Sequence, residues 1–246
     1  MAAGVRKGGE GKCKMVNGEM VIHGQIKKID RMIIRFDDIR LRPFDIPKFR
    51  GYLANKYPDY TLIHNHLSDN KYRYAYPSIQ FKIIDGRPVI VGIGDGIEVL
   101  KHVFLDIEEL DINSRIHHVD EKSIALDSVE IGQVRNRIDY CFLWPWMALN
   151  SDNYREYRRL QWHDQRRFLE TILSRNLKSL SKGLDYFIPD FDRLHVQADL
   201  KPVARNFKNI KMVCFEGTFS ANFIIPDYLG IGKQTARGFG TVKRIG

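Results

Sequence analysis

The chain has little cysteine and no long apolar run. Of its 246 residues only Cys13, Cys141 and Cys214 are cysteines, odd in number and far apart. Without a CxxC pair or a disulfide framework, the expected location is a reducing cytoplasm. No stretch approaches the roughly 18 uninterrupted apolar residues of a membrane helix, so no membrane partner is predicted. The charged residues near the N-terminus precede no apolar core, so residues 1–19 are expected to be a flexible leader and not a signal peptide.

Acidic residues are too few to balance the basic ones. Lys and Arg number 39 and Asp and Glu 30, which gives a formal net charge of +9, and the pI is about 9.4. Such an excess favours a polyanionic partner, nucleic acid above all. With 43% hydrophobic and 28% charged residues, the composition is that of a globular protein and excludes a disordered or fibrous chain.

The glycine-rich segment Gly230–Gly240 lacks the pattern of a nucleotide-binding loop. Gln234 follows its lysine where a P-loop requires Ser or Thr, and Thr235 stands where a dinucleotide fingerprint requires Gly. Its glycines permit positive φ and close approach, so consecutive N–H groups can converge on an anion beside two cations. We predict that it binds a phosphate backbone; a plain surface turn is the alternative. The predicted RNA contacts are Gly230, Gly232, Lys233, Arg237, Gly238 and Gly240.

The order of hydrophobic patterns in the first half is typical of an α+β unit. Asp85-Gly86 between two β-rich runs is a strong hairpin signal. The resulting order, β-α-β-β-α-β, is the ferredoxin-like, RRM-like arrangement. The expected elements are a strand or hairpin over 26–41, a helix over 46–53, a strand end over 61–66, strands over 79–84 and 89–93, a helix over 98–107 and β-like structure over 112–131.

A second unit of the same kind follows. A helical stripe of apolar residues begins at Phe168 and stops near Gly183, between a β-like run over 137–143 and strands over 196–203 and 210–225. We therefore predict two tandem ferredoxin-like domains. The predicted divisions are a leader over 1–19, an N-terminal domain over 20–133 that carries the candidate catalytic histidines, and a C-terminal domain over 134–246 that ends in the glycine-rich loop.

His64 and His66 form the pair with the clearest chemical potential. On a strand, residues i and i+2 project from one face, with attachment points about 6.6 Å apart, twice the strand rise. Two imidazoles at that separation can flank one phosphodiester, one taking the proton of a ribose 2′-OH and the other protonating the departing 5′-oxygen. This chemistry requires no metal and no other cofactor, and no further zinc ligands follow at a recognisable spacing. A surface pair without a catalytic role is the alternative.

Aromatic and basic residues alternate just after this pair. Lys71-Tyr-Arg-Tyr-Ala-Tyr76 is followed by Lys82, and such mixtures stack bases and neutralise phosphates on RNA-binding surfaces. We predict RNA contacts for Lys71, Arg73 and Lys82; an amphipathic strand with solvated charges is the alternative. A second cluster of this composition runs from Tyr154 to Arg159, with Arg166-Arg167 after it.

Together these residues resemble the CRISPR-associated repeat-RNA endoribonucleases of the repeat-associated mysterious protein superfamily, in the subtype with a C-terminal Gly-rich loop. The resemblance covers most of the chain, roughly from Arg42 to Ile245. The sequences that carry it are Arg42-Pro, Phe49-Arg-Gly, His64-Asn-His, Arg73 through Gln80 to Lys82, Pro145-Trp, Ser181-Lys-Gly-Leu184, Asn222-Phe, and Pro226 through Gly232 to Gly240.

The resemblance implies two ferredoxin-like domains and metal-independent cleavage of the CRISPR repeat transcript by 2′-OH attack. The products would be a 2′,3′-cyclic phosphate and a 5′-OH. It places His64 and His66 at the catalytic position, with Tyr72 or Tyr74 assisting, and the sequence does not choose between the two tyrosines. The implied partner is CRISPR repeat RNA; a homodimer and association with effector-complex subunits are left open. The alternative function is a non-catalytic subunit that holds repeat or guide RNA in an effector complex.

Overall fold

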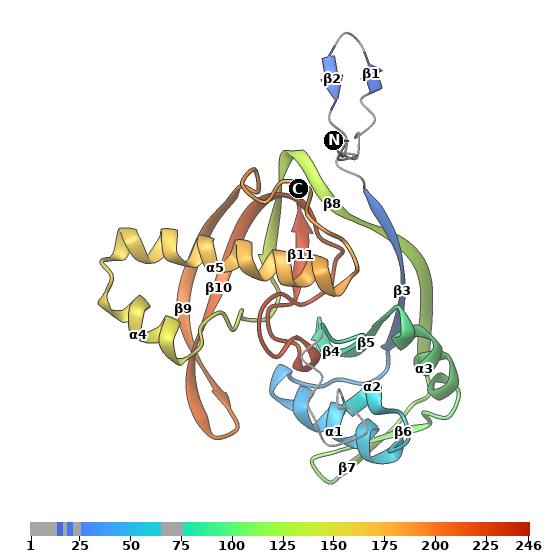
Figure 1. Ribbon diagram of the computed structural model, residues 1–246. Helices are drawn as coiled ribbons and strands as arrows, with labels where there is room; N and C mark the ends of the chain where they lie inside the picture. The colour runs from blue at the N-terminus through green and yellow to red at the C-terminus, as the bar shows by residue number, and fades with distance from the viewer. Residues whose placement is uncertain (1–13, 17–18, 22–25, 65–75) are drawn as a thin grey trace, which may run out of the picture.

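The computed structural model describes residues 14–16, 19–21, 26–64 and 76–246 (Figure 1). The predicted leader lies mostly outside these residues. Within it, β1 (Lys14–Val16) pairs antiparallel with β2 (Glu19–Val21). In the parts of the chain that are described, no helix is long and apolar enough to cross a membrane.

The first module has the predicted βαββαβ order. Its sheet runs β4-β5-β3-β8 with antiparallel pairing throughout. The helix predicted from Ile46 and the hairpin around Asp85-Gly86 are confirmed. Its elements are β3 (Lys27–Phe36), η1 (Pro43–Asp45), α1 (Ile46–Lys56), α2 (Thr61–His64), β4 (Ile79–Ile84), β5 (Arg87–Ile93), α3 (Asp95–Phe104), the β6–β7 hairpin (Glu109–Ile112 and Arg115–His118) and the first part of β8 (Lys122–Phe142).

The second module repeats the strand order of the first. Its strands run β9-β10-β8-β11, with the long helix α5 in front of them (Figure 1). In both modules the second strand lies at one edge, followed by the third, first and fourth, so the chain contains two tandem ferredoxin-like units. The elements after β8 are α4 (Ser151–Arg159), α5 (Trp162–Gly183), β9 (Val196–Phe207), β10 (Ile210–Ile224), η2 (Thr235–Arg237) and β11 (Val242–Ile245).

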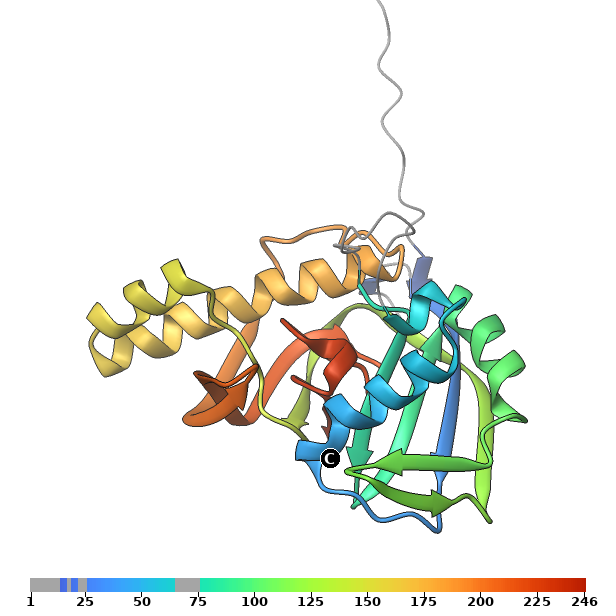
Figure 2. The ribbon, with the colours of Figure 1, turned by 90° about the horizontal axis from the view of Figure 1, so that it is seen from below.

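The second module departs from the ferredoxin-like pattern between its third and fourth strands. Where α3 stands in the first module, the second has only the glycine-rich segment with the short 3-10 helix η2. Figure 2 shows this segment, in dark red, beside α1 and β4 of the first module. With this segment in place of a second helix, the second module has room for a loop that lies between the two modules.

The strand β8 belongs to both modules. It pairs with β3 as far as Ile131 and with β10 from Gly132 onward, so one seven-stranded sheet runs through the molecule. The sequence predicted two separate β stretches here because the polar residues 135–137 interrupt the apolar pattern. In the structure these residues form a bulge inside a continuous strand. The division at 133/134 falls within β8 and stays a prediction.

Hydrophobic side chains join the modules. Met32, Ile34 and Ile90 point into a core under the helices of the first module. Their neighbours Ile33 and Val91 point the other way and join the core of the second module. Both faces of this sheet are therefore buried at β3 and β5, whereas Ile124 and Leu126 of β8 are exposed.

The prediction of a strand end at Thr61–His66 is wrong for the described part, because Thr61–His64 forms the one-turn helix α2. The Ile63 N–H donates to the Tyr60 carbonyl at 3.0 Å, and the Ile63 side chain is buried in the core. Tertiary burial of this turn overrides the β preference of Thr61 and Ile63. Because His64 ends a helix and does not lie on a strand, the argument that His64 and His66 project from one strand face no longer holds.

Candidate functional site

The glycine-rich loop, Gly230–Gly240, is held by three polar contacts from one short stretch of the first module. The Gly230 N–H donates to Gln80 Oε1 at 3.0 Å. The Tyr76 hydroxyl donates to the Gly230 carbonyl at 2.8 Å, and Lys82 Nζ donates to the Thr235 carbonyl at 3.2 Å. The last residue of the aromatic and basic run, Tyr76, and two residues of the strand that follows thus hold the C-terminal loop.

Strand β4 explains why these side chains meet the loop. Ile79 and Phe81 face the helix-covered core, whereas Gln80 and Lys82 alternate to the opposite face. Both are almost fully buried, at 0% and 1% exposure, because the loop covers them. The prediction that Lys82 contacts RNA is therefore wrong for this arrangement. Burial also lowers the pKa of its amine from 10.5 to about 7.

Two glycines show why the loop requires this residue type. Gly240 has φ +64°, and a Cβ there would lie 2.0 Å from the Ile231 carbonyl oxygen. Gly238 has φ +85°, and its Cβ would lie 2.6 Å from Ile46 Cδ1 on α1. Side chains rarely adopt such φ values and would clash here. The glycines therefore let the loop fold on itself and approach α1.

Several loop N–H groups bind protein acceptors. Those of Ile231, Lys233 and Gly240 donate to the carbonyls of Gly240, Met147 and Pro145, respectively. At these positions the expectation of N–H groups turned toward an anion is wrong, because the loop uses them to hold its own shape. Gly232, Lys233 and Gln234 form its exposed part.

A pair of guanidinium groups lies where the loop meets α1. Arg237 is half-buried, with its guanidinium carbon 5.3 Å from the centre of the Phe207 ring. Burial, and then the positive charge of Arg237, lowers the pKa of Arg50 to about 10. Two cations close enough to repel each other would be stabilised by an anion between them. Sequence reasoning gave Arg50 no role, although Phe49-Arg-Gly was among the sequences that carry the resemblance.

The candidate catalytic segment, His64 to Tyr74, lies in the sequence between two stretches that make defined contacts. It begins at α2, whose Ile63 is buried, and the described chain resumes at Tyr76, which is bonded to the loop. Gly183 of α5 makes room for Tyr76, since a Cβ there would lie 2.1 Å from Tyr76 Cβ. His64 is the last residue of α2. His66, Lys71, Tyr72, Arg73 and Tyr74 lie outside the described residues, so their predicted roles stay predictions.

Among the residues that the structure describes, no three His, Cys, Asp or Glu side chains are grouped so that they could hold a metal ion. His66 is not one of these residues.

The repeated βαββαβ order gives the two ferredoxin-like domains that the resemblance to the repeat-associated mysterious protein superfamily implies. Models of the Cas6b N-terminal and C-terminal domains match residues 27–130 and 132–245. The chain belongs to the Cas6b family.

Similarity to individual proteins supports this family assignment. A crystal structure of Cas6b is 41% identical, covering 89% of this chain and 100% of that one, with a TM-score of 0.85. A crystal structure of the CRISPR RNA processing endoribonuclease Cas6b is 38% identical with the same coverage and a TM-score of 0.73. An uncharacterized protein of Methanocaldococcus jannaschii is 36% identical over 143 residues, 58% of this chain and 97% of that protein.

Proposed function

We propose that this protein is an endoribonuclease that cleaves CRISPR repeat transcripts into guide RNAs. The observation that carries the proposal is the likeness, over the full length of the relative, to the CRISPR RNA processing endoribonuclease Cas6b at 38% identity. The basic charge of the chain supports a polyanionic substrate.

We assign the chemistry to His64 and His66. One imidazole takes the proton from the ribose 2′-OH, and the 2′-oxygen forms a bond to phosphorus as the bond from phosphorus to the 5′-oxygen breaks. The other imidazole protonates that leaving oxygen. The products are a 2′,3′-cyclic phosphate and a 5′-OH, and Tyr72 or Tyr74 assists. The contacts of α2 and of Tyr76, on either side of this segment in the sequence, support this assignment, because an acid and a base must be held in a defined geometry.

We assign RNA binding to the cations of the glycine-rich loop and of the aromatic and basic run Lys71–Tyr76. Lys233 and Arg237 supply positive charge at the loop, Arg50 adds to it from α1, and Lys71 and Arg73 flank the candidate tyrosines. A cytoplasmic location, a homodimer and association with effector subunits stay predictions from the sequence.

One experiment tests the activity and the mechanism together. The purified protein is incubated in EDTA with the repeat RNA of its own locus, and the product ends are mapped. We expect cleavage within the repeat, a 2′,3′-cyclic phosphate and a 5′-OH. A deoxyribose immediately upstream of the scissile phosphate should abolish cleavage, because the nucleophile is then missing.

The outcomes separate the two candidate functions. Full cleavage of the deoxy substrate would contradict the 2′-OH mechanism. Tight binding of the repeat RNA without cleavage under any condition would favour the non-catalytic subunit of an effector complex.

A further inference from the structure

A polar groove lies on the second module. Its volume is about 820 Å³, and its walls come from β8, α5 and the start of β9. None of its lining residues belongs to the glycine-rich loop or to the candidate catalytic segment. It is therefore a different surface from the site described above.

The bulge in β8 builds one wall of this groove. Gln133 pairs with Phe223 and Ile138 with Ala221, so residues 134–137 of β8 stand opposite the single residue Asn222 of β10. A bulge of this kind turns side chains away from the regular pleat. Arg135 and Arg137, both exposed, line the groove from it.

Asn222 fixes the opposite wall. Its side chain is buried, accepts the His195 N–H at 2.7 Å through Oδ1 and donates to the Arg193 carbonyl at 2.9 Å through Nδ2. The same residue thus faces the bulge and holds the start of β9. Because a buried amide holds the segment that leads into β9 and lies opposite the bulge of β8, the groove is a built feature of the fold.

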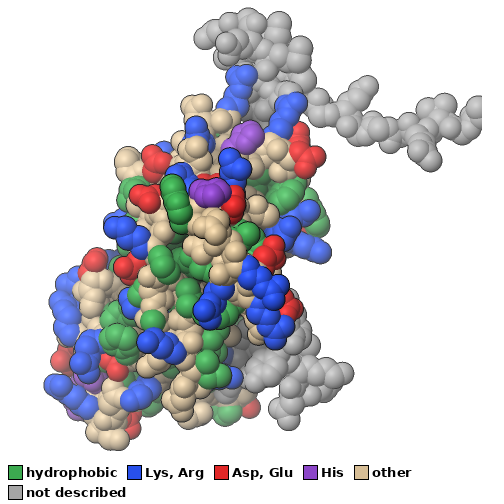
Figure 3. Space-filling view, turned by 90° about the vertical axis from the view of Figure 1, so that its left-hand side faces the viewer, with side chains coloured by type: hydrophobic (Ala, Val, Ile, Leu, Met, Phe, Trp, Pro, Cys, Tyr) green, Lys and Arg blue, Asp and Glu red, His purple; other side chains and the backbone are tan. Residues whose placement is uncertain are grey.

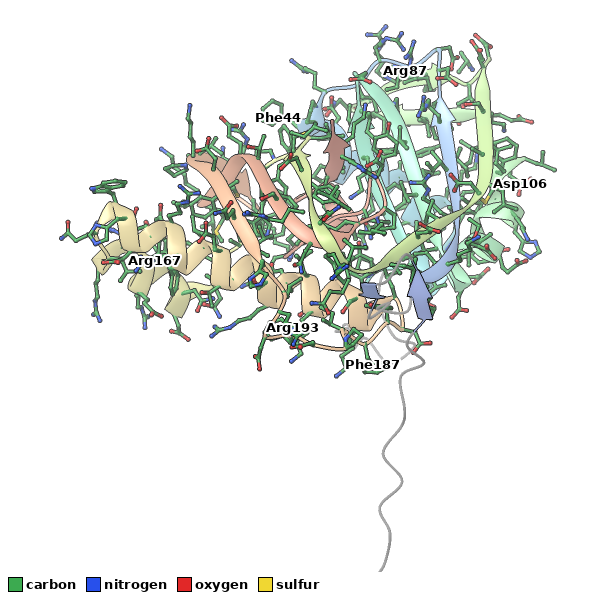
Figure 4. The ribbon with its side chains drawn as sticks, turned by 90° about the horizontal axis from the view of Figure 1, so that it is seen from above. Phe44, Arg87, Asp106, Arg167, Phe187 and Arg193 are labelled. Atoms are coloured by element: carbon green, nitrogen blue, oxygen red, sulfur yellow. The ribbon has the colours of Figure 1, made fainter. Side chains whose placement is uncertain are left out.

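The groove is positively charged. Arg167 lines it from α5, together with Arg135 and Arg137 from β8. Figure 4 labels Arg167. Glu170 is the only acidic residue among those that line it. Its Oε1 accepts from Arg166 Nε at 3.1 Å and from the Ala198 N–H at 3.0 Å, so its charge is already offset. Figure 3 shows Lys and Arg side chains spread over the side of the molecule to which α4 and α5 extend.

The lining chemistry distinguishes among anionic ligands. The lining residues include no Phe, Tyr or Trp, and His195 is the one aromatic ring among them, so the lining offers cations and hydroxyls more than surfaces for base stacking. Guanidinium groups suit phosphate oxygens, and the hydroxyls of Thr171 and Ser174, which donate to carbonyls of α5, can accept from ribose hydroxyls. We propose that this groove binds the sugar–phosphate backbone of the repeat RNA at nucleotides away from the cleaved phosphodiester. The identity of the RNA rests on the proposed function.

Binding of an uncleavable repeat RNA tests the proposal. The RNA carries deoxyribose at the scissile position, and affinity is measured in EDTA across salt concentrations. Arg137→Ala with Arg167→Ala removes two exposed cations. The slope of log K against log salt should become shallower by about 1.4, so raising salt from 50 to 200 mM should weaken wild-type binding about sevenfold more than variant binding.

A matched pair controls for net charge. Lys101→Ala with Arg115→Ala removes two exposed cations from the first module and should leave the slope unchanged. An unchanged slope in the groove variant, or an equal change in the control, would overturn the proposal. Arg167→Glu alone, an exposed substitution on α5, gives the same readout if the double variant fails to fold; it should make the slope shallower by about 0.7 or more.

The groove and the catalytic proposal fail separately. A wild-type protein that binds with the expected slope and never cleaves would refute the catalytic proposal and leave the groove standing. Normal cleavage by the wild type, together with an unchanged slope in the groove variant, would refute the groove proposal and leave the catalytic proposal standing.

Discussion

At the scale of single residues, the most unusual group is the buried amine of Lys82. A lysine normally keeps its charge in water, and burial without a carboxylate penalises the charged form. Here the Nζ donates to the Thr235 carbonyl, so the contact that fixes the loop depends on a group with a pKa of about 7. The sequence could not indicate this, because the residues that cover Lys82 lie some 150 positions away in the chain.

Lys82→Met should remove a pH dependence of stability. Since the pKa is about 7 in the folded protein and 10.5 ordinarily, the unfolded chain binds more protons between these values. The free energy of unfolding should therefore rise with pH across this window, and the penalty should be complete below about pH 7. The difference between wild type and variant, from urea titrations at pH 6.5 and 9.5, should change by on the order of 2 kcal/mol. Equal differences at both values would show that the amine is not desolvated.

The histidine pair gives the second prediction at this scale. His64→Ala and His66→Ala should each slow cleavage by about 10²- to 10⁴-fold, the range for a lost acid or base, with little change in RNA affinity. His118→Ala, at an exposed position of β7, is the control and should cleave normally. Single-turnover rates measure the effect. If both variants matched wild type, the catalyst would have to be sought first at Tyr72 and Tyr74.

At the scale of elements, the sequence predicted the helices and hairpins whose formation depends on interactions between residues close together in the chain. The helix from Ile46 and the hairpin at Asp85-Gly86 follow from Pro47 in the first turn and from turn chemistry. The one-turn helix α2 was missed because burial of Ile63 determines it. Helix α4 was also missed, although Asn150 caps it by accepting the Asn153 N–H at 2.7 Å. The cap was a usable signal, but the basic surface of α4 offers no apolar stripe.

The glycine-rich loop is the element with a direct test. Lys233→Ala with Arg237→Ala should make the salt slope of RNA binding shallower by about 1.4, or about 0.7 per lost contact to a single strand. The His64 and His66 variants should keep the wild-type slope, as should the Lys101 and Arg115 control pair. An unchanged slope with a normal melting temperature would leave the loop as a structural turn between the modules.

At the scale of the whole molecule, the doubled fold was predictable and the joint between its halves was not. The two runs of βαββαβ pattern are visible in the hydrophobic order, and the strand order of both sheets follows from that fold. The sharing of β8 was hidden by the polar residues 135–137, which resemble a linker. The candidate catalytic residues could be named from the chemistry of imidazole and from the family resemblance. Arg50 and the groove could be recognised only in the three-dimensional structure.

The continuous strand restricts how this protein can exchange parts with its relatives. Ile33 and Val91 of the first module are buried against the second, at 7% and 0% exposure. A hybrid gene joined at the middle of β8 would have to match strand twist and this apolar surface at once, and either half made alone would expose it to water. Recombination between family members should therefore preserve the two halves as a co-inherited pair.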